Sequence, residues 1–197
     1  MTQILDQVRA HLRGHFGAEP DSARVTFLGA ETIEVLRFHS YADGLMHYMS
    51  LGCSRHPMTD PTEIVTDPQR GPRAEIVLRL RDPGPATGIA RSLAILAATP
   101  AVDGVVLAAD ALIDLGSPLW AWPSARVPFT AVLLGHSDIP DLALAPPRDS
   151  VKFLSATPIT ATEAAWVRLK GAEAMRQAWQ NDGVDVLDPK RPAAQPS

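Results

Sequence analysis

The sequence predicts a single α+β domain in which a mostly antiparallel sheet packs against a few helices. Its candidate strands come in runs instead of alternating one for one with helices, which favours this class over a parallel α/β fold. Residues 73–80 alternate apolar side chains with Glu75, Val77 and Arg79, a pattern typical of an antiparallel strand with one covered and one wetter face. A chain of 197 residues, 46% of them apolar, is long enough to bury one core.

The first half of the chain predicts one helix and then a run of strands. Ile4, Val8 and Leu12 recur at three-to-four spacing, which indicates an amphipathic helix that ends at Gly17. The dipeptide Asp43-Gly44 is a strong hairpin signal. We expect strands within residues 23–29, 32–40, 45–51 and 73–80, and an irregular loop over 55–72.

The second half predicts two helices and three strands. The first helix covers residues 88–99 and stops before Pro100. Thr160 and Glu163 form a reciprocal capping box at the start of the second helix, which continues to Asn181. The strands lie within residues 110–116, 128–135 and 151–160. Residues 189–197 lack large apolar side chains, so we expect one domain over 1–188 followed by a disordered tail over 189–197.

The composition argues against several classes of protein. The net charge is −4 and no stripe of lysine or arginine is present, which speaks against a nucleic-acid binder. Neither the N-terminal segment nor the most apolar stretch, residues 102–115, has the uninterrupted apolar core of a signal peptide or a membrane span. The single cysteine fits a reducing compartment, so the sequence predicts a cytoplasmic protein that does not bind a membrane.

No recognisable reaction chemistry emerges from the motifs. Cys53 lies three residues before His56, but a turn containing Pro57 gives no reason for the two side chains to meet. One cysteine with scattered histidines is a weak zinc site, and the pair His11 and His15 lacks a third ligand. Nucleotide and nucleophile signatures are absent. We therefore predict no enzyme activity, no catalytic residue, no cofactor and no metal.

The ordered segments resemble the suppressor of fused (SUFU) domain over about residues 24–191. The segments that carry the resemblance are HYMSLGCSRHPM, RAEIVLRL, ARSLAILAATP, DALIDLGSPLW, FTAVLLGHSD and VKFLSATPITATEAAWVRLKGAEAM. The most characteristic parts are the corner Gly52-x-Ser54, the strand Ala74-Glu75-Ile76 and the late PIT-x-x-E block. The length is similar to that of the bacterial stand-alone members, whereas eukaryotic members carry a further C-terminal domain.

The resemblance implies a protein that works by binding. Eukaryotic members sequester a transcription factor by gripping an extended peptide as an added strand, and bacterial members are proposed to be immunity proteins that neutralise a toxin domain. The expected partner is therefore a protein or an extended peptide, such as a toxin domain. Two alternatives stay open: an intracellular regulator or scaffold that sequesters a peptide-bearing partner, and an unrecognised hydrolase that uses Cys53 or a His–Asp pair.

The strand over residues 45–51 and the loop after it are the expected contact surface, because they combine polar, aromatic and acidic side chains. The predicted partner-binding residues are Tyr48, Ser54, His56, Asp60 and Glu75. The competing interpretation is that Tyr48 belongs to the core and the charged groups are merely solvated. In the same way Trp120 and Trp122 could be core plugs or partner anchors.

Overall fold

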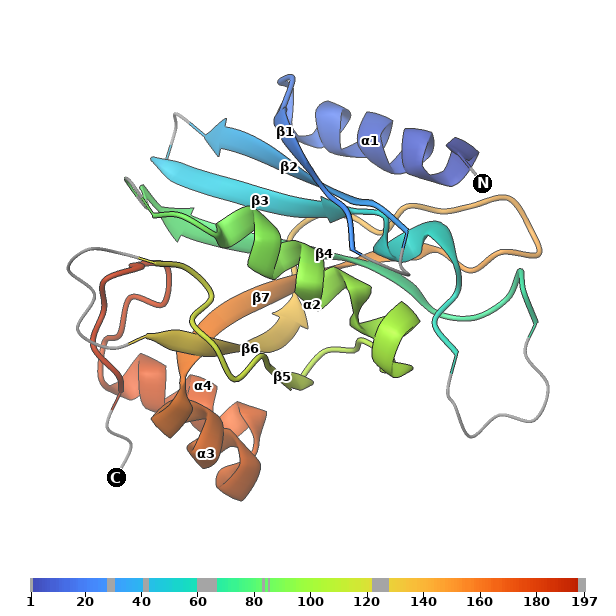
Figure 1. The fold of residues 1–197 in the computed structure, drawn as a ribbon. Helices are drawn as coiled ribbons and strands as arrows, with labels where there is room; N and C mark the ends of the chain where they lie inside the picture. Colours follow the sequence, from blue (N-terminus) through green and yellow to red (C-terminus); the bar gives the residue numbers. More distant parts are fainter. Residues whose placement is uncertain are drawn as a thin grey trace.

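One seven-stranded sheet with helices on both faces organises the protein (Figure 1). The computed structural model describes residues 2–27, 31–40, 43–59, 67–82, 84, 86–121 and 128–194. The strands are β1 (Asp21–Val25), β2 (Ile33–Ser40), β3 (Leu45–Leu51), β4 (Arg73–Arg81), β5 (Leu112–Asp114), β6 (Phe129–His136) and β7 (Val151–Thr160). The helices are α1 (Thr2–Phe16), the short 3₁₀ turn η1 (Cys53–Arg55), α2 (Ile89–Asp103), α3 (Ala161–Lys170) and α4 (Ala172–Asn181).

The sheet order is β1-β2-β3-β4-β7-β6-β5, so β1 and β5 form its two edges. Every neighbouring pair is antiparallel except β4 and β7, which run parallel. The predicted α+β class with a mostly antiparallel sheet is therefore confirmed.

Side-chain alternation along the strands sends one set of apolar groups to α2 and the other to α1. In β2, Ile33 and Val35 belong to the core beneath α2, whereas Leu36 and Phe38 belong to the core beneath α1. The pair α3 and α4 covers β6 and β7 on the same side of the sheet as α1. Both faces of β4 are consequently covered, and the prediction of a wetter face carrying Glu75 is wrong, since Glu75 is 0% exposed.

α2 continues through Pro100 to Asp103, one turn beyond the predicted end. Pro100 has no N–H to donate to the carbonyl of Leu96 four residues earlier. The hydroxyl of Thr99 donates a hydrogen bond to that carbonyl instead, at 2.8 Å. This side-chain bond satisfies an acceptor that the proline leaves open in the last turn of the helix.

The predicted C-terminal helix is in fact two helices that meet at Gly171. Gly171 has a φ of 92°, a conformation that glycine adopts without a steric penalty and that interrupts a right-handed helix. The predicted capping box at Thr160 and Glu163 is present, with both reciprocal hydrogen bonds formed.

Residues 189–194 are packed against the domain, which corrects the prediction that the tail is disordered from residue 189. Arg191 is buried and forms a two-pronged ion pair with Glu163, at 2.7 Å to Oε1 and 3.0 Å to Oε2. Its guanidinium also lies over the rings of Phe129 and Trp179. The segment lacks large apolar side chains, but the arginine supplies the attachment that composition did not reveal.

Glu163 is ionised in this setting despite its burial. Burial by itself raises the pKa of the carboxyl. This effect is outweighed by hydrogen bonds from Arg191 and the Thr160 N–H, by the charge of Arg191 and by a hydrogen bond from Trp179. The pKa of Glu163 therefore lies below its ordinary value of 4.5. Its charged form stabilises the fold above that value, and this contribution is lost as the pH falls through the lowered native pKa.

Replacing Arg191 with methionine is expected to lower the free energy of unfolding by about 3–5 kcal/mol at pH 7, because Glu163 is left charged and buried without its cation. The pKa of Glu163 should then rise, so the deficit relative to the wild type should be smaller at pH 5 than at pH 7. Urea denaturation at both pH values measures this. Arg13→Met is the control, since the Arg13–Glu19 pair lies in solvent and should contribute less than about 1 kcal/mol. A deficit equal to that of the control contradicts the prediction.

Candidate functional site

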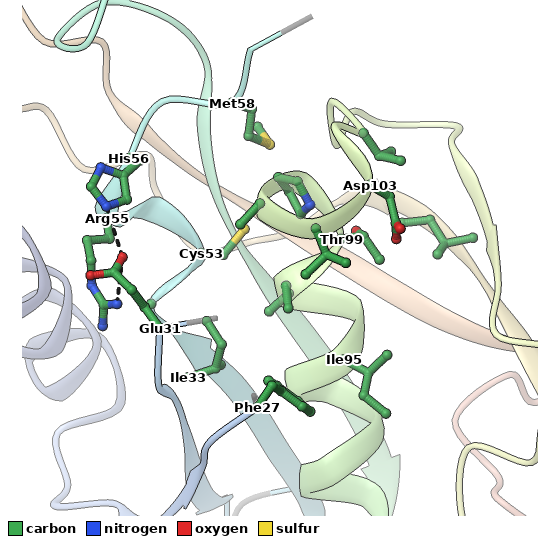
Figure 2. Close-up of a pocket in the computed structure, with 18 of the residues that line it drawn as sticks. Phe27, Glu31, Ile33, Cys53, Arg55, His56, Met58, Ile95, Thr99 and Asp103 are labelled. Atoms are coloured by element: carbon green, nitrogen blue, oxygen red, sulfur yellow. Dashed lines mark hydrogen bonds and ion pairs between the residues drawn. The ribbon is translucent and has the colours of Figure 1, made fainter. Parts of the chain in front are cut away.

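A groove with a volume of about 1090 Å³ runs beside the C-terminal half of α2 (Figure 2). We call it the α2 groove. One wall comes from the segment after β1 and from the η1 region, and the other comes from β5. Its lining consists of Phe27, Glu31, Ile33, residues 52, 53 and 55–59, Ile95, residues 97–103, Val105 and residues 112–115.

The η1 wall is held to the sheet by the carboxylate of Glu75 on β4. Its Oε1 accepts hydrogen bonds from the N–H of Gly52 at 2.9 Å and from the N–H and hydroxyl of Ser54 at 3.0 and 2.6 Å. Its Oε2 accepts a hydrogen bond from the hydroxyl of Ser50, whose oxygen in turn accepts the N–H of Ile76. Four donors on one buried carboxylate fix the course of the chain where it leaves β3.

Gly52 makes the sharp departure from β3 possible. Its φ is 146°, and a Cβ at this position would lie 2.8 Å from the Cδ1 of Ile33. A larger residue would therefore be strained at this turn, which glycine adopts without a side-chain clash. Arg73 secures the far side of the same turn by donating to the carbonyls of Ser54 and Arg55 at 2.8 and 3.0 Å.

Cys53 is a buried part of the groove wall. Figure 2 shows its sulfur on the side that faces α2. Burial raises the pKa of the thiol well above its ordinary value, and the negative charge of Glu75 adds to the rise. A nucleophilic cysteine needs the opposite shift. His56 contacts Glu31 at 2.9 Å, so the structure does not bring the cysteine and the histidine of this segment together as a catalytic pair.

Charged groups gather at the outer edge of the η1 wall. Glu31 contacts both Arg55, at 3.0 Å, and His56, and Figure 2 shows the three side chains converging. The hydrogen bond from Arg55 holds the pKa of Glu31 below its ordinary value. Slight burial raises this pKa, and a hydrogen bond with His56 lowers it further. Arg55 also donates to the carbonyl of Thr32 at 3.0 Å, which ties this group to the start of β2.

The opposite wall comes from β5, which is an edge strand of the sheet. Ala111, Ile113 and Leu115 direct their backbone groups to β6: Ala111 accepts from Leu134, and Leu115 donates to Thr130. Backbone groups alternate in direction along a strand. The N–H and C=O groups of Leu112 and Asp114 therefore point away from β6.

The predicted contact residues do not form one exposed surface. Ser54 and Glu75 are both 0% exposed and hold the wall together, and Tyr48 is 8% exposed within the core beneath α2. His56 is exposed and lines the groove, whereas Asp60 lies outside the described residues. β3 itself pairs with β2 on one side and β4 on the other, so it cannot accept an added strand. Tyr48, Ser54 and Glu75 are thus buried, which corrects the expected role of direct contact.

Sequence reasoning missed the groove residues contributed by α2 and β5. Val102 and Val105 are exposed apolar side chains at the end of α2, and Asp103 lies between them. The sequence did offer a signal for these residues, namely the run of apolar and acidic residues after Pro100. It was assigned to no element because the helix was predicted to end at residue 99.

Trp120 is buried and the centroid of its ring lies 5.3 Å from that of Phe129, so it is a core residue. Trp122 lies outside the described residues.

Among the described residues, no group of three or more His, Cys, Asp or Glu side chains could hold a metal ion. No helix in that part of the chain has the length and apolar character needed to cross a membrane.

Comparisons with known proteins are consistent with this geometry. A family model described as suppressor of fused protein (SUFU) matches residues 29–192. The fold resembles a crystal structure described as a SUFU homolog from Neisseria gonorrhoeae FA 1090, with a TM-score of 0.67, 18% identity, and coverage of 98% of this chain and 97% of that one. The Sufu-Fu complex matches with a TM-score of 0.66 and 14% identity, over 96% of this chain and 91% of that one.

Drosophila Suppressor of Fused matches with a TM-score of 0.65 and 16% identity, over 96% of this chain and 50% of that one. The present chain thus spans half the length of the Drosophila chain. At these identities the similarity to solved structures establishes the fold alone. The search of the curated proteins found no match.

Replacing Glu75 with glutamine is expected to lower the free energy of unfolding by about 2–4 kcal/mol, because the amide has one acceptor oxygen where four donors converge. Chemical denaturation measures the loss. The matched control is Asp21→Asn, since the carboxylate of Asp21 pairs with Arg37 in solvent and should contribute less than about 1 kcal/mol. Equal stability of the two variants would show that Glu75 does not anchor the wall.

The thiol of Cys53 is expected to react with an aromatic disulfide reagent at pH 8 at least about 100-fold more slowly in the native protein than in the denatured chain. Both its burial and its raised pKa suppress the thiolate. Absorbance of the released thiol follows the reaction, and the denatured protein is the internal reference. Rapid labelling of the native protein contradicts the burial and reopens the hydrolase alternative.

Proposed function

Because the chain belongs to the suppressor of fused family, we propose that it is a non-enzymatic binding protein that holds an extended segment of a partner protein in the α2 groove. The observation that carries the proposal is the groove itself, which joins an apolar floor to a free strand edge. Ile33, Cys53, Met58 and Ile95 offer apolar contacts, while the N–H and C=O groups of Leu112 and Asp114 point away from β6 and toward a possible partner strand.

Two features of β5 support strand addition at this edge. Its outward N–H and C=O groups can pair with the main chain of a partner, and the neighbouring groove can receive the partner's side chains. β5 has only three residues, and short edge strands limit unspecific pairing between sheets. The other edge strand, β1, has exposed side chains along most of its length and so offers little apolar support for a partner.

The identity of the partner is a finer part of the proposal. We propose a toxin domain as the partner, which makes the chain an immunity protein of a bacterial cell. Family membership supports this, together with the shared fold of the Neisseria gonorrhoeae homolog. A cytoplasmic location belongs to the same proposal and fits the single cysteine. The second candidate is a regulator that sequesters a partner, and it is favoured by the shared fold of the Sufu-Fu complex.

Affinity capture with matched variants tests the proposal. Val102 is 64% exposed and lines the groove, whereas Leu169 is 74% exposed on α3 and does not line it. Because both side chains are largely in solvent, Val102→Asp and Leu169→Asp should fold equally well. We expect one stoichiometric protein to be retained by the wild type and by Leu169→Asp but lost, with at least about tenfold weaker binding, from Val102→Asp.

The identity of the retained protein separates the two candidates. A toxin domain whose effect on growth is relieved by co-expression of the wild type supports immunity, and a non-toxic regulatory protein supports sequestration. A partner that is retained equally by Val102→Asp and Leu169→Asp refutes binding in the α2 groove.

A further inference from the structure

We propose that the partner segment carries an arginine or lysine whose charged head binds Asp103 at the C-terminal end of α2. This inference rests on the proposed function and names the chemistry that the groove selects. Asp103 is the last residue of α2, is exposed and lines the α2 groove. In Figure 2 it lies on the opposite side of α2 from Glu31, Arg55 and His56.

The carboxylate of Asp103 is electrostatically uncompensated. The C-terminal end of a helix carries partial negative charge from its last carbonyls, which favours a cation and disfavours an acid. The last turn of α2 contains no basic residue. Within the described ranges, no ion pair or hydrogen bond to the Asp103 carboxylate is formed.

The other two carboxylates of the groove are already paired. Asp114 binds Arg168 at 2.6 Å and accepts the N–H of Gly116 at 2.9 Å. Glu31 is shared by Arg55 and His56. Of these three carboxylates, Asp103 is therefore the one that an incoming cation can bind without displacing a cation that is already paired with it.

The neighbours of Asp103 fit the aliphatic part of a basic side chain. Val102 is 64% exposed and Val105 is 38% exposed, and they account for two of the three large apolar side chains exposed in the part of the chain that the structure describes. Arginine and lysine combine an apolar stem with a charged head, so the stem can cover the valines while the head reaches the carboxylate. A purely apolar residue would bury the carboxylate unpaired, and an acidic one would be repelled.

The segment therefore has a defined pattern. A main chain that pairs with β5 would lie in the same groove as Asp103, whose lining also includes the apolar side chains of Cys53 and Met58. We infer an extended segment with a basic residue close to an apolar residue. Among the three carboxylates of the lining, Asp103 is the one without an ion pair within the described residues, which matches a basic partner segment and disfavours an acidic one.

A displayed library of random 12-residue peptides, selected on the immobilised full-length protein, tests this pattern whatever the identity of the partner. Selections use the wild type, Asp103→Asn, Asp103→Arg and Val102→Arg. The control is Asp141→Asn, because Asp141 is exposed on the loop after β6 and does not line the groove. Fluorescence anisotropy then measures the affinity of the selected peptides for each variant.

We expect wild-type peptides to share an arginine or lysine at a constant distance from an apolar residue. Their binding should weaken about tenfold with Asp103→Asn, stay unchanged with Asp141→Asn and be lost with Val102→Arg, whose cation repels a basic segment. Asp103→Arg should instead select aspartate or glutamate at the same position. Two outcomes overturn the inference but leave the proposed function standing. In the first, the peptides need the groove but share no basic position; in the second, they bind Asp103→Asn with the same affinity as the wild type. Peptides that bind Val102→Arg as well as the wild type overturn both.

Discussion

The carboxylate of Glu75 joins β4 to the end of β3, and the wall of the α2 groove depends on that joint. A buried ionised group is tolerated only when donors replace the water it has lost. Here the replacement comes from two backbone N–H groups and two serine hydroxyls. Because both backbone donors belong to the turn after β3, the charge that needs them also determines where that turn runs. Cys53, His56 and Met58 take their positions in the groove from this turn.

A second buried carboxylate, that of Glu163, organises the opposite end of the sheet by a different means. Its partners include a full positive charge from Arg191, so the interaction attaches a segment distant in sequence. Glu75 relies on neutral donors close to it in the sheet, and it shapes a turn instead of attaching a segment. The two carboxylates thus hold segments on either side of β4 and β7, while β5 forms the edge of the sheet beyond β6.

The residues of the candidate site could be predicted only in part. The resemblance drew attention to Ser54 and Glu75, and both are indeed central to the groove wall. Their role could not be deduced from alternation along residues 73–80, because alternation shows that two faces differ but not what covers each one. The turn after β3, which donates to its carboxylate, is packed against Glu75, and the side chain is fully buried. Val102 and Asp103 were missed because proline was expected to end the helix.

The sequence by itself determined the α+β class, most strand positions, the hairpin at Asp43-Gly44 and the capping box at Thr160, since these follow from local backbone preference and from side-chain periodicity. The tertiary structure decided the burial of Glu75, the pairing of β3 on both sides and the attachment of residues 189–194 through Arg191. The physical reason is the same in each case. Burial and pairing depend on groups that lie far apart along the chain, and no local pattern records which of them will meet.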